Sequence, residues 1–281
     1  MVAETLKELY EETLSAAPTS FEAGELFTHV TGVKPLDADT RPAEPKQRQQ
    51  LETLLKRRGG GYPLQYLLGE WEFYSLPFKV GPGVLIPRQD TETLVDAALG
   101  ALRTMAVPEP QVLDLCSGSG CVAIAVKHEH PAAAVTAQEF SPEAYSYLTQ
   151  NIALNGLEIT PHLSDLREYT HPVPVDLIVS NPPYIPQSQF RDLQAEVGFE
   201  PLAALDGGED GLYYFRAIAR RFKEQLRPGG ALLLEIGMEQ EEEVAAILRE
   251  NNFERITFHK DLNGIVRVVE SRSPIKGTSL S

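Results

Sequence analysis

The chain has 281 residues, of which 42% are hydrophobic and 23% charged, and its net charge is −15 at pH 7. That length suffices for one large core or two domains, and the composition is that of an ordinary globular protein. The negative charge argues against extended contact with a nucleic-acid backbone, whose affinity depends on Lys and Arg. No run reaches the roughly 18 consecutive apolar residues that a membrane-spanning helix needs. We therefore expect neither stable nucleic-acid binding nor contact with a membrane.

The cysteines and the first residues indicate the compartment. Cys116 and Cys121 are the only two cysteines, too few for a disulfide framework or a four-ligand zinc site. The histidines and carboxylates show no spacing that predicts a metal site. The start, MVAETLKELYEETL, has neither the apolar core of a signal peptide nor the Arg-rich character of a transit peptide. We expect a cytoplasmic protein without a metal, and a monomer by default.

Three helical patterns come before any strand pattern. Residues 2–16 carry apolar residues at helical spacing, and Thr19-Ser20 offer an N-cap before residues 21–30. A third pattern, over residues 44–58, ends at three glycines. The sequence therefore predicts a small all-helical N-terminal domain over residues 1–69.

The sequence pattern changes near residue 70, where the helical spacing of apolar residues gives way to strand-like alternation. Alternating aromatic residues on either side of Ser75-Leu76-Pro77 predict a β-hairpin connector over residues 70–90. Over residues 91–281 strand and helix patterns alternate, which predicts an α/β fold with a mainly parallel, seven-stranded sheet. The predicted strands are 111–115, 133–140, 159–163, 175–180, 230–236, 254–260 and 264–270, and the predicted helices are 119–128, 142–154, 211–226 and 239–250. Only a short turn separates the last two strands, so they should form an antiparallel hairpin at the end of the sheet.

The stretch QVLDLCSGSGCVAIAV, residues 111–126, reads as a strand, a Gly-rich turn and a helix. Gly118 and Gly120 allow a tight turn and let a ligand touch the backbone. Ser119 is expected to cap the helix that follows. Asp114 stands at the carboxyl end of the strand, where open α/β sheets bind ligands. A turn that only packs the strand against the helix explains the same two glycines.

Acidic residues at the ends of the next two strands narrow the choice of ligand. Glu139 follows the Gly turn by about 20 residues, a position suited to ribose hydroxyls. After the third strand, Asp165 suits an adenine amino group and Leu166 suits the face of the ring. Carboxylates would repel a pyrophosphate, and neither the third Gly of GxGxxG nor a phosphate-binding Lys is present. A cationic nucleoside, S-adenosylmethionine, therefore fits better than NAD or ATP.

In order and spacing, DLCSGSG, QEFS, SDL and SNPPY resemble the motifs of class I S-adenosylmethionine-dependent methyltransferases. NPPY after the fourth strand is similar to the signature of those that methylate planar nitrogens, either glutamine amides or adenine amines. The resemblance implies a Rossmann-like domain and S-adenosylmethionine as the cofactor, with S-adenosyl-L-homocysteine as its product. The cofactor-binding residues that we expect are Asp114, Cys116, Ser117, Gly118, Ser119, Gly120, Glu139, Asp165, Leu166 and Asn181.

The chemistry of an amide substrate agrees with the SNPPY sequence. An amide nitrogen is a poor nucleophile because its lone pair is delocalised into the carbonyl. Asn181 Oδ1 and the Pro182 carbonyl are suited to accept its two N–H bonds, and Tyr184 to stack on the planar group. Pro182 and Pro183 fix the backbone and leave no N–H to compete as a donor. We expect orientation to supply most of the catalysis, with Asn181, Pro182 and Tyr184 as catalytic residues.

Further segments resemble one subfamily, the bacterial peptide chain release factor N5-glutamine methyltransferases. They are GYPLQYLLGEWEFYSLPFKVGPGVLIPRQDTE (61–92), EVGFEPLAALDGGEDGL (196–212), EIGMEQ (235–240) and DLNGIVR (261–267). The resemblance implies methylation of the side-chain nitrogen of the glutamine in the GGQ motif of release factors, which the helical N-terminal domain would recognise. It also implies a set of substrate-binding residues: Asn181, Pro182, Pro183, Tyr184, Arg88 and Glu196.

Three departures from the family pattern stand out. Gln89-Asp90 replaces the common Pro-Glu, which leaves the role of that loop open. Cys116 stands where Gly is most usual, which is tolerable if its φ angle is negative. Glu139 replaces the usual Asp and is one methylene longer, still able to hold a ribose diol.

Three alternatives to this function differ in substrate or class. The first is glutamine methylation of a ribosomal protein. The second is adenine-N6 methylation of nucleic acid, against which the acidic charge and the absence of a basic target-recognition segment count. The third is a catalytically silent cofactor-binding protein, against which the intact NPPY sequence counts.

Overall fold

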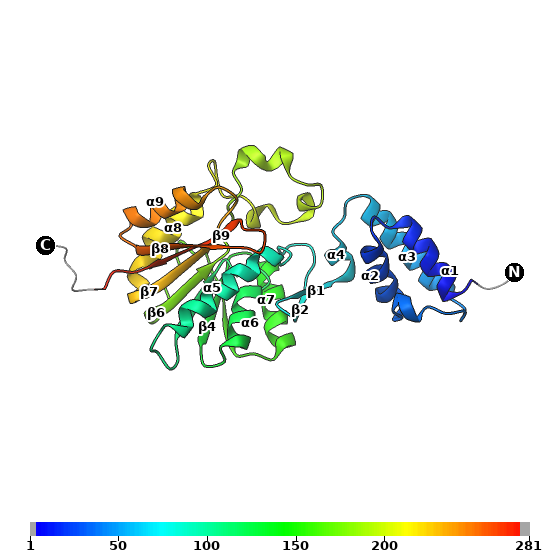
Figure 1. The fold of residues 1–281 in the computed structure, drawn as a ribbon, viewed down its shortest axis with the longest axis horizontal. Helices are drawn as coiled ribbons and strands as arrows, with labels where there is room; N and C mark the ends of the chain where they lie inside the picture. Colours follow the sequence, from blue (N-terminus) through cyan, green and yellow to red (C-terminus); the bar gives the residue numbers. More distant parts are fainter. Residues whose placement is uncertain (1–3, 276–281) are drawn as a thin grey trace. The chain divides into compact units, whose positions relative to one another are not determined.

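The computed structural model describes residues 4–275, and the chain divides into two compact units (Figure 1). The helical unit comprises Met1–Glu70 and Gln194–Phe199. The α/β unit comprises Trp71–Leu193 and Glu200–Ser281. A six-residue segment of the C-terminal part of the chain is thus a component of the helical unit, which the sequence boundaries at 69 and 90 do not anticipate.

The helical unit contains α1 (Leu6–Ala16), α2 (Ser20–Thr31), α3 (Pro45–Gly59) and α4 (Leu64–Leu68). The first helix begins after Thr5, whose side chain caps it, and residues 2 and 3 of the predicted helix lie outside the described residues. Thr19 caps α2 as the sequence predicts. The short α4 was not predicted, because five residues are too few to show a helical period.

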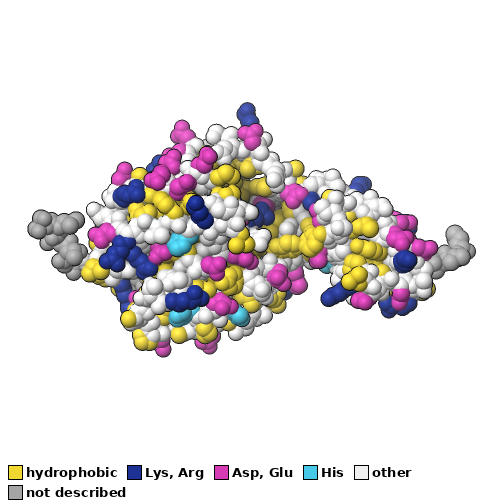
Figure 2. Space-filling model, viewed as in Figure 1, with side chains coloured by type: hydrophobic (Ala, Val, Ile, Leu, Met, Phe, Trp, Pro, Cys, Tyr) yellow, Lys and Arg dark blue, Asp and Glu magenta, His cyan; other side chains and the backbone are white. Residues whose placement is uncertain are grey.

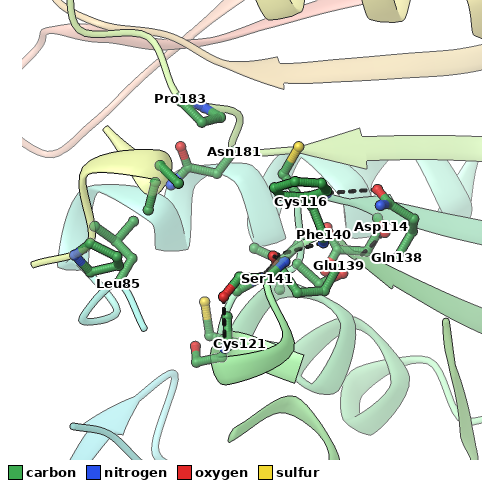
Figure 3. Close-up of a pocket in the computed structure, with 18 of the residues that line it drawn as sticks. Leu85, Asp114, Cys116, Cys121, Gln138, Glu139, Phe140, Ser141, Asn181 and Pro183 are labelled. Atoms are coloured by element: carbon green, nitrogen blue, oxygen red, sulfur yellow. Dashed lines mark hydrogen bonds between the residues drawn. The ribbon is translucent and has the colours of Figure 1, made fainter. Parts of the chain in front are cut away.

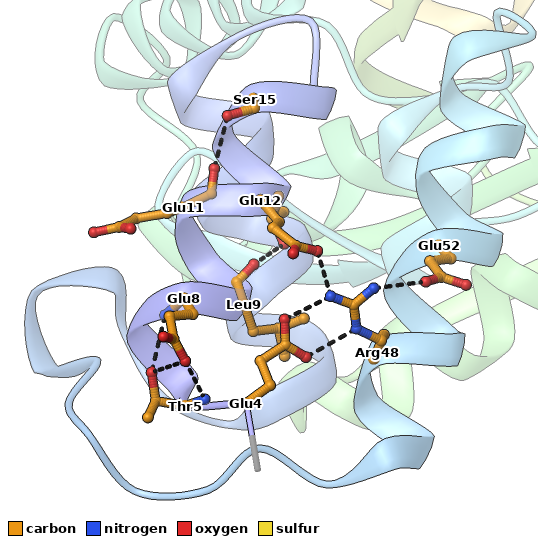
Figure 4. A network of polar contacts seen from close by, with 10 residues as sticks. Glu4, Thr5, Glu8, Leu9, Glu11, Glu12, Ser15, Arg48 and Glu52 are labelled. Atoms are coloured by element: carbon orange, nitrogen blue, oxygen red, sulfur yellow. Dashed lines mark hydrogen bonds and ion pairs between the residues drawn. The ribbon is translucent and has the colours of Figure 1, made fainter. Parts of the chain in front are cut away.

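Apolar residues and one arginine hold these helices together. Leu26, Phe27 and Leu51 are almost fully buried, and each such side chain contributes about 1.5–3 kcal/mol. Arg48 on α3 binds Glu4 at 2.7 Å and Glu12 at 2.6 Å, and so joins α3 to the first helix and the residues before it (Figure 4). The helical unit therefore has a core and an ion-pair network of its own.

The segment Gln194–Phe199 binds to this unit through two contacts. The Phe199 ring lies 5.1 Å from the Tyr62 ring in an edge-on arrangement. Arg58 donates to Glu196 at 2.7 Å and also pairs with Glu22. The segment is thus fixed in the helical unit by an aromatic pair and a shared arginine.

The α/β unit is built on a seven-stranded sheet of order β5-β4-β3-β6-β7-β9-β8. Its strands are β3 (Gln111–Leu115), β4 (Ala134–Glu139), β5 (Ile159–Leu163), β6 (Val175–Ser180), β7 (Leu226–Glu235), β8 (Glu254–Lys260) and β9 (Val266–Arg272). The first five run parallel, and β9 is antiparallel to both of its neighbours. The predicted mainly parallel sheet that ends in an antiparallel hairpin is confirmed.

Helices cover both faces of this sheet (Figure 1). One face carries α5 (Glu92–Arg103), α6 (Cys121–Glu129) and α7 (Pro142–Asn155), and the other carries α8 (Tyr213–Phe222) and α9 (Glu241–Glu250). Before the sheet come β1 (Glu70–Phe73) and β2 (Leu76–Lys79), which pair with each other as a two-stranded sheet. These layers are those of the Rossmann-like fold that the sequence predicts.

In the α/β unit, helix α5 and the starts of α6 and β7 differ from the sequence predictions. Helix α5 was not predicted, although seven of its side chains are buried. Helix α6 begins at Cys121 rather than at 119, with Gly120 at its N-cap and no side-chain capping bond, so the expected cap by Ser119 is wrong. Strand β7 begins at Leu226 rather than at 230, because it continues through Pro228 and two glycines.

Charges of both signs cover the surface. On the face that Figure 2 shows, Asp and Glu side chains are interspersed with Lys and Arg. The excess of acid is therefore distributed over that face. Among residues 4–275, no helix combines the length and the apolar character needed to cross a membrane.

Candidate active site

A cavity lies in the α/β unit at the carboxyl ends of β3, β4 and β6, the edge where such sheets bind ligands (Figure 3). Many residues singled out in the sequence line it. They are Arg88, Asp114, Cys116, Ser117, Gly118, Ser119, Glu139, Asp165, Leu166, Asn181 and Pro183. Parallel strands bring these segments together because their carboxyl ends meet at one edge.

The turn after β3 is tight, and three of its residues have a left-handed backbone. The φ angles are +58° at Cys116, +55° at Gly118 and +82° at Gly120. Cys116 therefore does not have the negative φ at which its side chain would be tolerated without strain. A Cβ in the left-handed region costs about 1–2 kcal/mol. Gly120 is required for packing, because a Cβ there would lie 2.5 Å from Leu148 Cδ1. At Gly118 a Cβ would meet nothing within 4 Å, so the backbone there is open to a ligand.

Glu139 holds this turn in place. Its Oε2 accepts the Gly118 N–H at 2.7 Å, and its Oε1 accepts the N–H groups of Phe140 at 2.8 Å and Ser141 at 2.7 Å. Burial raises the pKa of the Glu139 carboxyl, and the three N–H groups act in the opposite direction by favouring the charged form. The carboxylate therefore orders the turn in addition to lining the cavity, a contact that the sequence does not reveal.

The other two carboxylates on this side differ sharply in their partners. Asp114 is 1% exposed, and its Oδ2 has no hydrogen-bond partner among the described residues. Burial raises the pKa of Asp114 to about 7, with smaller opposing contributions from Ser117 and the Ala123 backbone. Asp165 instead pairs with Arg167, mainly through side-chain hydrogen bonds that lower the pKa of Asp165. Of these two carboxylates, Asp114 is the one without a cationic partner among the described residues.

The fourth predicted feature, SNPPY, follows β6, whose six residues are all buried. Asn181 and Pro183 line the cavity, whereas Pro182 and Tyr184 are not among the described residues that line it. The Tyr184 ring packs against the hydrophobic core, and burial raises the pKa of its hydroxyl. Its backbone carbonyl accepts from Gln240 Nε2 at 3.1 Å. The loop is therefore anchored by Tyr184, with Asn181 facing the cavity.

Arg88 and Glu196 have separate partners. Arg88 pairs with Glu200, whose other oxygen accepts the Ile86 N–H at 3.0 Å. Glu196 belongs to the helical unit, where it pairs with Arg58. Glu200 was missed in the sequence, although it lies in the segment 196–212 that carries the family resemblance.

Two further residues at this edge, Thr91 and Glu235, were not predicted from the sequence. Asn181 Nδ2 donates to Thr91 Oγ1 at 3.3 Å, and both residues lie beside Glu235, the last residue of β7. A usable signal was present for Glu235: like Asp114 and Glu139, it is an acidic residue at the end of a buried strand. Asp90, one of the two residues that replace the common Pro-Glu of the family pattern, pairs with Arg267 at 2.7 Å.

The fold occurs in solved methyltransferases. The 16S rRNA N2 G1207 methyltransferase of T. thermophilus, in complex with AdoMet and guanosine, superposes with a TM-score of 0.52 at 21% identity. The match covers 73% of this chain and 49% of that one. At this identity the likeness establishes the fold alone.

Sequence comparisons are more specific. The family "Methyltransferase small domain" matches residues 92–197, and the "PrmC N-terminal domain" matches residues 5–69. A release factor glutamine methyltransferase of Geobacter sulfurreducens is 42% identical over 233 residues, 83% of this chain and 81% of that protein. Its counterpart in Fusobacterium nucleatum is 40% identical over 234 residues, 82% of this chain and 65% of that protein.

The cavity also fits the methyl donor of such enzymes. S-adenosylmethionine carries an ammonium and a sulfonium, and Asp114 Oδ2 is a buried acceptor without a partner among the described residues. The open backbone at Gly118 allows close approach of the ligand. S-adenosylmethionine is the cofactor. The chain is a methyltransferase and belongs to the release factor glutamine methyltransferase family.

Proposed function

We propose that this protein methylates the side-chain amide nitrogen (N5) of the glutamine in the GGQ motif of peptide chain release factors. It would do so in the cytoplasm, as a monomer. The observation that carries the proposal is the position of Asn181, an amide that follows a buried strand and faces the same cavity as the acidic residues. The identity to release factor glutamine methyltransferases over most of the chain supports the same substrate.

Asn181 and Pro182 would orient the glutamine amide. Its –NH₂ group offers two N–H bonds, and Asn181 Oδ1 and the Pro182 carbonyl are two acceptors on adjacent residues. Holding both hydrogens fixes the nitrogen and favours its pyramidal form, which exposes a lone pair toward the methyl donor. Pro183 lines the cavity beside Asn181, and Tyr184 would anchor the loop through the core against which its ring packs. Orientation of this kind is a large part of the catalysis of a two-substrate reaction.

The residues after β3, β4 and β5 would hold the cofactor. S-adenosylmethionine supplies a methyl group on a sulfonium and leaves as S-adenosyl-L-homocysteine. Asp114 would pair with a cationic group, and the backbone of residues 116–120 would approach the ligand closely. Glu139 keeps acceptor capacity beyond its three N–H partners for ribose hydroxyls. Asp165 would accept from the adenine amino group, and Leu166 would cover the ring.

Residues at the mouth of the cavity would guide the glutamine segment. Arg88 lines the cavity and is held by Glu200, so its guanidinium is placed by a buried carboxylate. The helical residues 1–69 would recognise the release factor, with residues 70–90 as the hairpin connector to the methyltransferase domain, residues 91–281.

A transfer assay with a labelled methyl group tests this function. The protein is incubated with methyl-labelled S-adenosylmethionine and either a purified release factor, ribosomal proteins or DNA, and the label is then located. We expect label on the glutamine of the GGQ motif and none on a release factor in which that glutamine is replaced by asparagine. Label on ribosomal protein or DNA, or no label under conditions that support turnover, would refute the proposal.

A further inference from the structure

The side-chain amide of Asn181 has two nearly identical ends. Its oxygen accepts hydrogen bonds and its nitrogen donates them, yet the two orientations occupy the same space. The proposed function requires the oxygen to face the cavity, because the substrate –NH₂ group can only donate. A residue that holds the nitrogen away from the cavity would therefore decide whether the site accepts an amide.

Thr91 is placed to hold that nitrogen. It is 2% exposed, and its Oγ1 lies 3.3 Å from Asn181 Nδ2. Thr91 stands at the N-cap of α5, where a threonine ordinarily accepts from the helix backbone, but its side chain makes no capping bond. Its hydroxyl is therefore available to Asn181.

The register of β6 and β7 places Glu235 beside Asn181. On β6 and β7, Ser180 pairs with Leu234, so the next residues, Asn181 and Glu235, leave adjacent strands side by side. Leu234 packs in the core cluster with α8 and α9. Because side chains alternate along a strand, Glu235 points to the opposite face, which α5 covers.

Glu235 is 2% exposed, and its Oε2 has no hydrogen-bond partner among the described residues. Burial raises the pKa of Glu235 to about 8, and the neighbouring Thr91 and Asn181 side chains act in the opposite direction by hydrogen bonding to it. Burying an acidic group costs folding free energy unless hydrogen bonds compensate it. Whether ionised or neutral, the carboxyl keeps an oxygen that can accept a hydrogen bond.

We propose that Thr91 and Glu235 are positioning residues that fix the Asn181 amide with its oxygen toward the substrate. The Thr91 hydroxyl has a single proton, which Glu235 accepts. Its oxygen can then only accept from Asn181, so Asn181 must offer it an N–H and turn Oδ1 to the cavity. This inference rests on the proposed function and names the residues that make its site select an amide over a carboxylate.

The test compares two forms of the release factor, with glutamine or glutamate in the GGQ motif. The glutamine form is the methyl acceptor and the glutamate form is a competitor. If the Asn181 nitrogen faced the cavity, it would donate a hydrogen bond to the glutamate carboxylate and so favour binding of the competitor. In Thr91→Val, we expect kcat to fall by about 10- to 100-fold, the size of a lost hydrogen bond with an unsatisfied partner. The glutamate form should inhibit this variant about tenfold more strongly than it inhibits the parent protein.

Two controls separate positioning from a structural effect. Thr91→Ser keeps the hydroxyl and should recover both kcat and the preference for glutamine. Thr93→Val makes the same chemical change on α5 at a residue outside the cofactor cavity, and it should alter neither quantity. A fall in melting temperature without a change in preference for glutamine over glutamate would overturn the inference.

Glu235 provides an independent route if Thr91→Val folds poorly. Glu235→Ala removes the acceptor and should weaken the preference for glutamine as Thr91→Val does, whereas Glu235→Gln keeps an oxygen acceptor and should lose much less. If the parent protein methylates glutamine and both Thr91→Val and Glu235→Ala retain its preference, this inference fails and the proposed function stands. If the parent protein does not methylate glutamine, the proposed function fails.

Discussion

The two sides of the cavity satisfy their polar groups in different ways. On the β3–β4 side, the Glu139 carboxylate accepts three backbone N–H groups, all within 2.8 Å. On the β6–β7 side, the Asn181 amide has a side-chain partner, Thr91, at 3.3 Å. A carboxylate has two equivalent oxygens, so backbone donors alone can position it. An amide has two different ends and needs a partner that distinguishes them.

This difference predicts a division of labour. The β3–β4 side should determine cofactor affinity, because it offers carboxylates and open backbone to a cation. The β6–β7 side should determine methyl transfer and the choice of substrate, because it offers an oriented acceptor. Substitutions on one side should therefore leave the function of the other side nearly intact.

Asn181→Ala tests the β6–β7 side and should have the largest effect. Methyl transfer to the release factor should fall by about 100- to 1,000-fold, the cost of removing one oriented hydrogen-bonding group from a reacting centre. The Kd for S-adenosylmethionine, measured by calorimetry, should change by no more than about threefold, within the energy of a single weak contact. Equal losses of affinity and activity would mean that Asn181 is a structural residue or a cofactor ligand.

The pH dependence of stability tests the buried acid on the same side. At low pH Glu235 is neutral in both the folded and unfolded states. As pH rises, the unfolded chain ionises first, from near 4.5, while burial keeps the folded group protonated to about 8. Stability of the cofactor-free protein is therefore lost over this range. Between about pH 5 and about pH 7, the free energy of unfolding of Glu235→Gln should gain about 2.5 kcal/mol over the parent protein.

Chemical denaturation at several pH values measures this difference. Glu239→Gln is a suitable control, since Glu239 is exposed and lies in the same segment. A difference between Glu235→Gln and the parent that stays constant with pH would contradict a raised pKa for Glu235.

Asp114→Asn tests the β3–β4 side. The Kd for S-adenosylmethionine should increase by about 10- to 100-fold, the energy of a hydrogen bond to a charged group, while kcat at saturating cofactor stays near that of the parent. Burial raises the pKa of Asp114 to about 7. The parent should consequently bind the cofactor more tightly as pH rises through this value, because ionised Asp114 attracts a cation. A lower kcat with unchanged Kd would place Asp114 outside cofactor binding.

Cys116 gives the smallest effect and tests the backbone of the turn. At a left-handed position glycine avoids the strain of a Cβ, so Cys116→Gly should be more stable than Cys116→Ala by about 1 kcal/mol. Comparing these two variants cancels the loss of the thiol. In the interior of a helix the order is reversed, so alanine as the more stable variant would show that the turn relaxes to a negative φ.

Much of the fold was predictable because its signals are local. Alternating strand and helix patterns predicted the parallel sheet and the final hairpin. Helix α5 was not predicted, although its apolar residues recur at helical spacing. The six residues 194–199 belong to the helical unit, which no local pattern in the sequence indicates.

The sequence by itself determined the chemical groups of the site. Asp114, Glu139 and Asn181 follow buried strands, and parallel strands bring their carboxyl ends to one edge, so their convergence could be inferred. Only the tertiary structure decided the partners of these groups. The Glu139 bonds to its turn, the Arg88 pair with Glu200 and the Thr91 contact with Asn181 depend on distances between segments up to 112 residues apart. Such distances are set by packing, which the order of residues along the chain does not display.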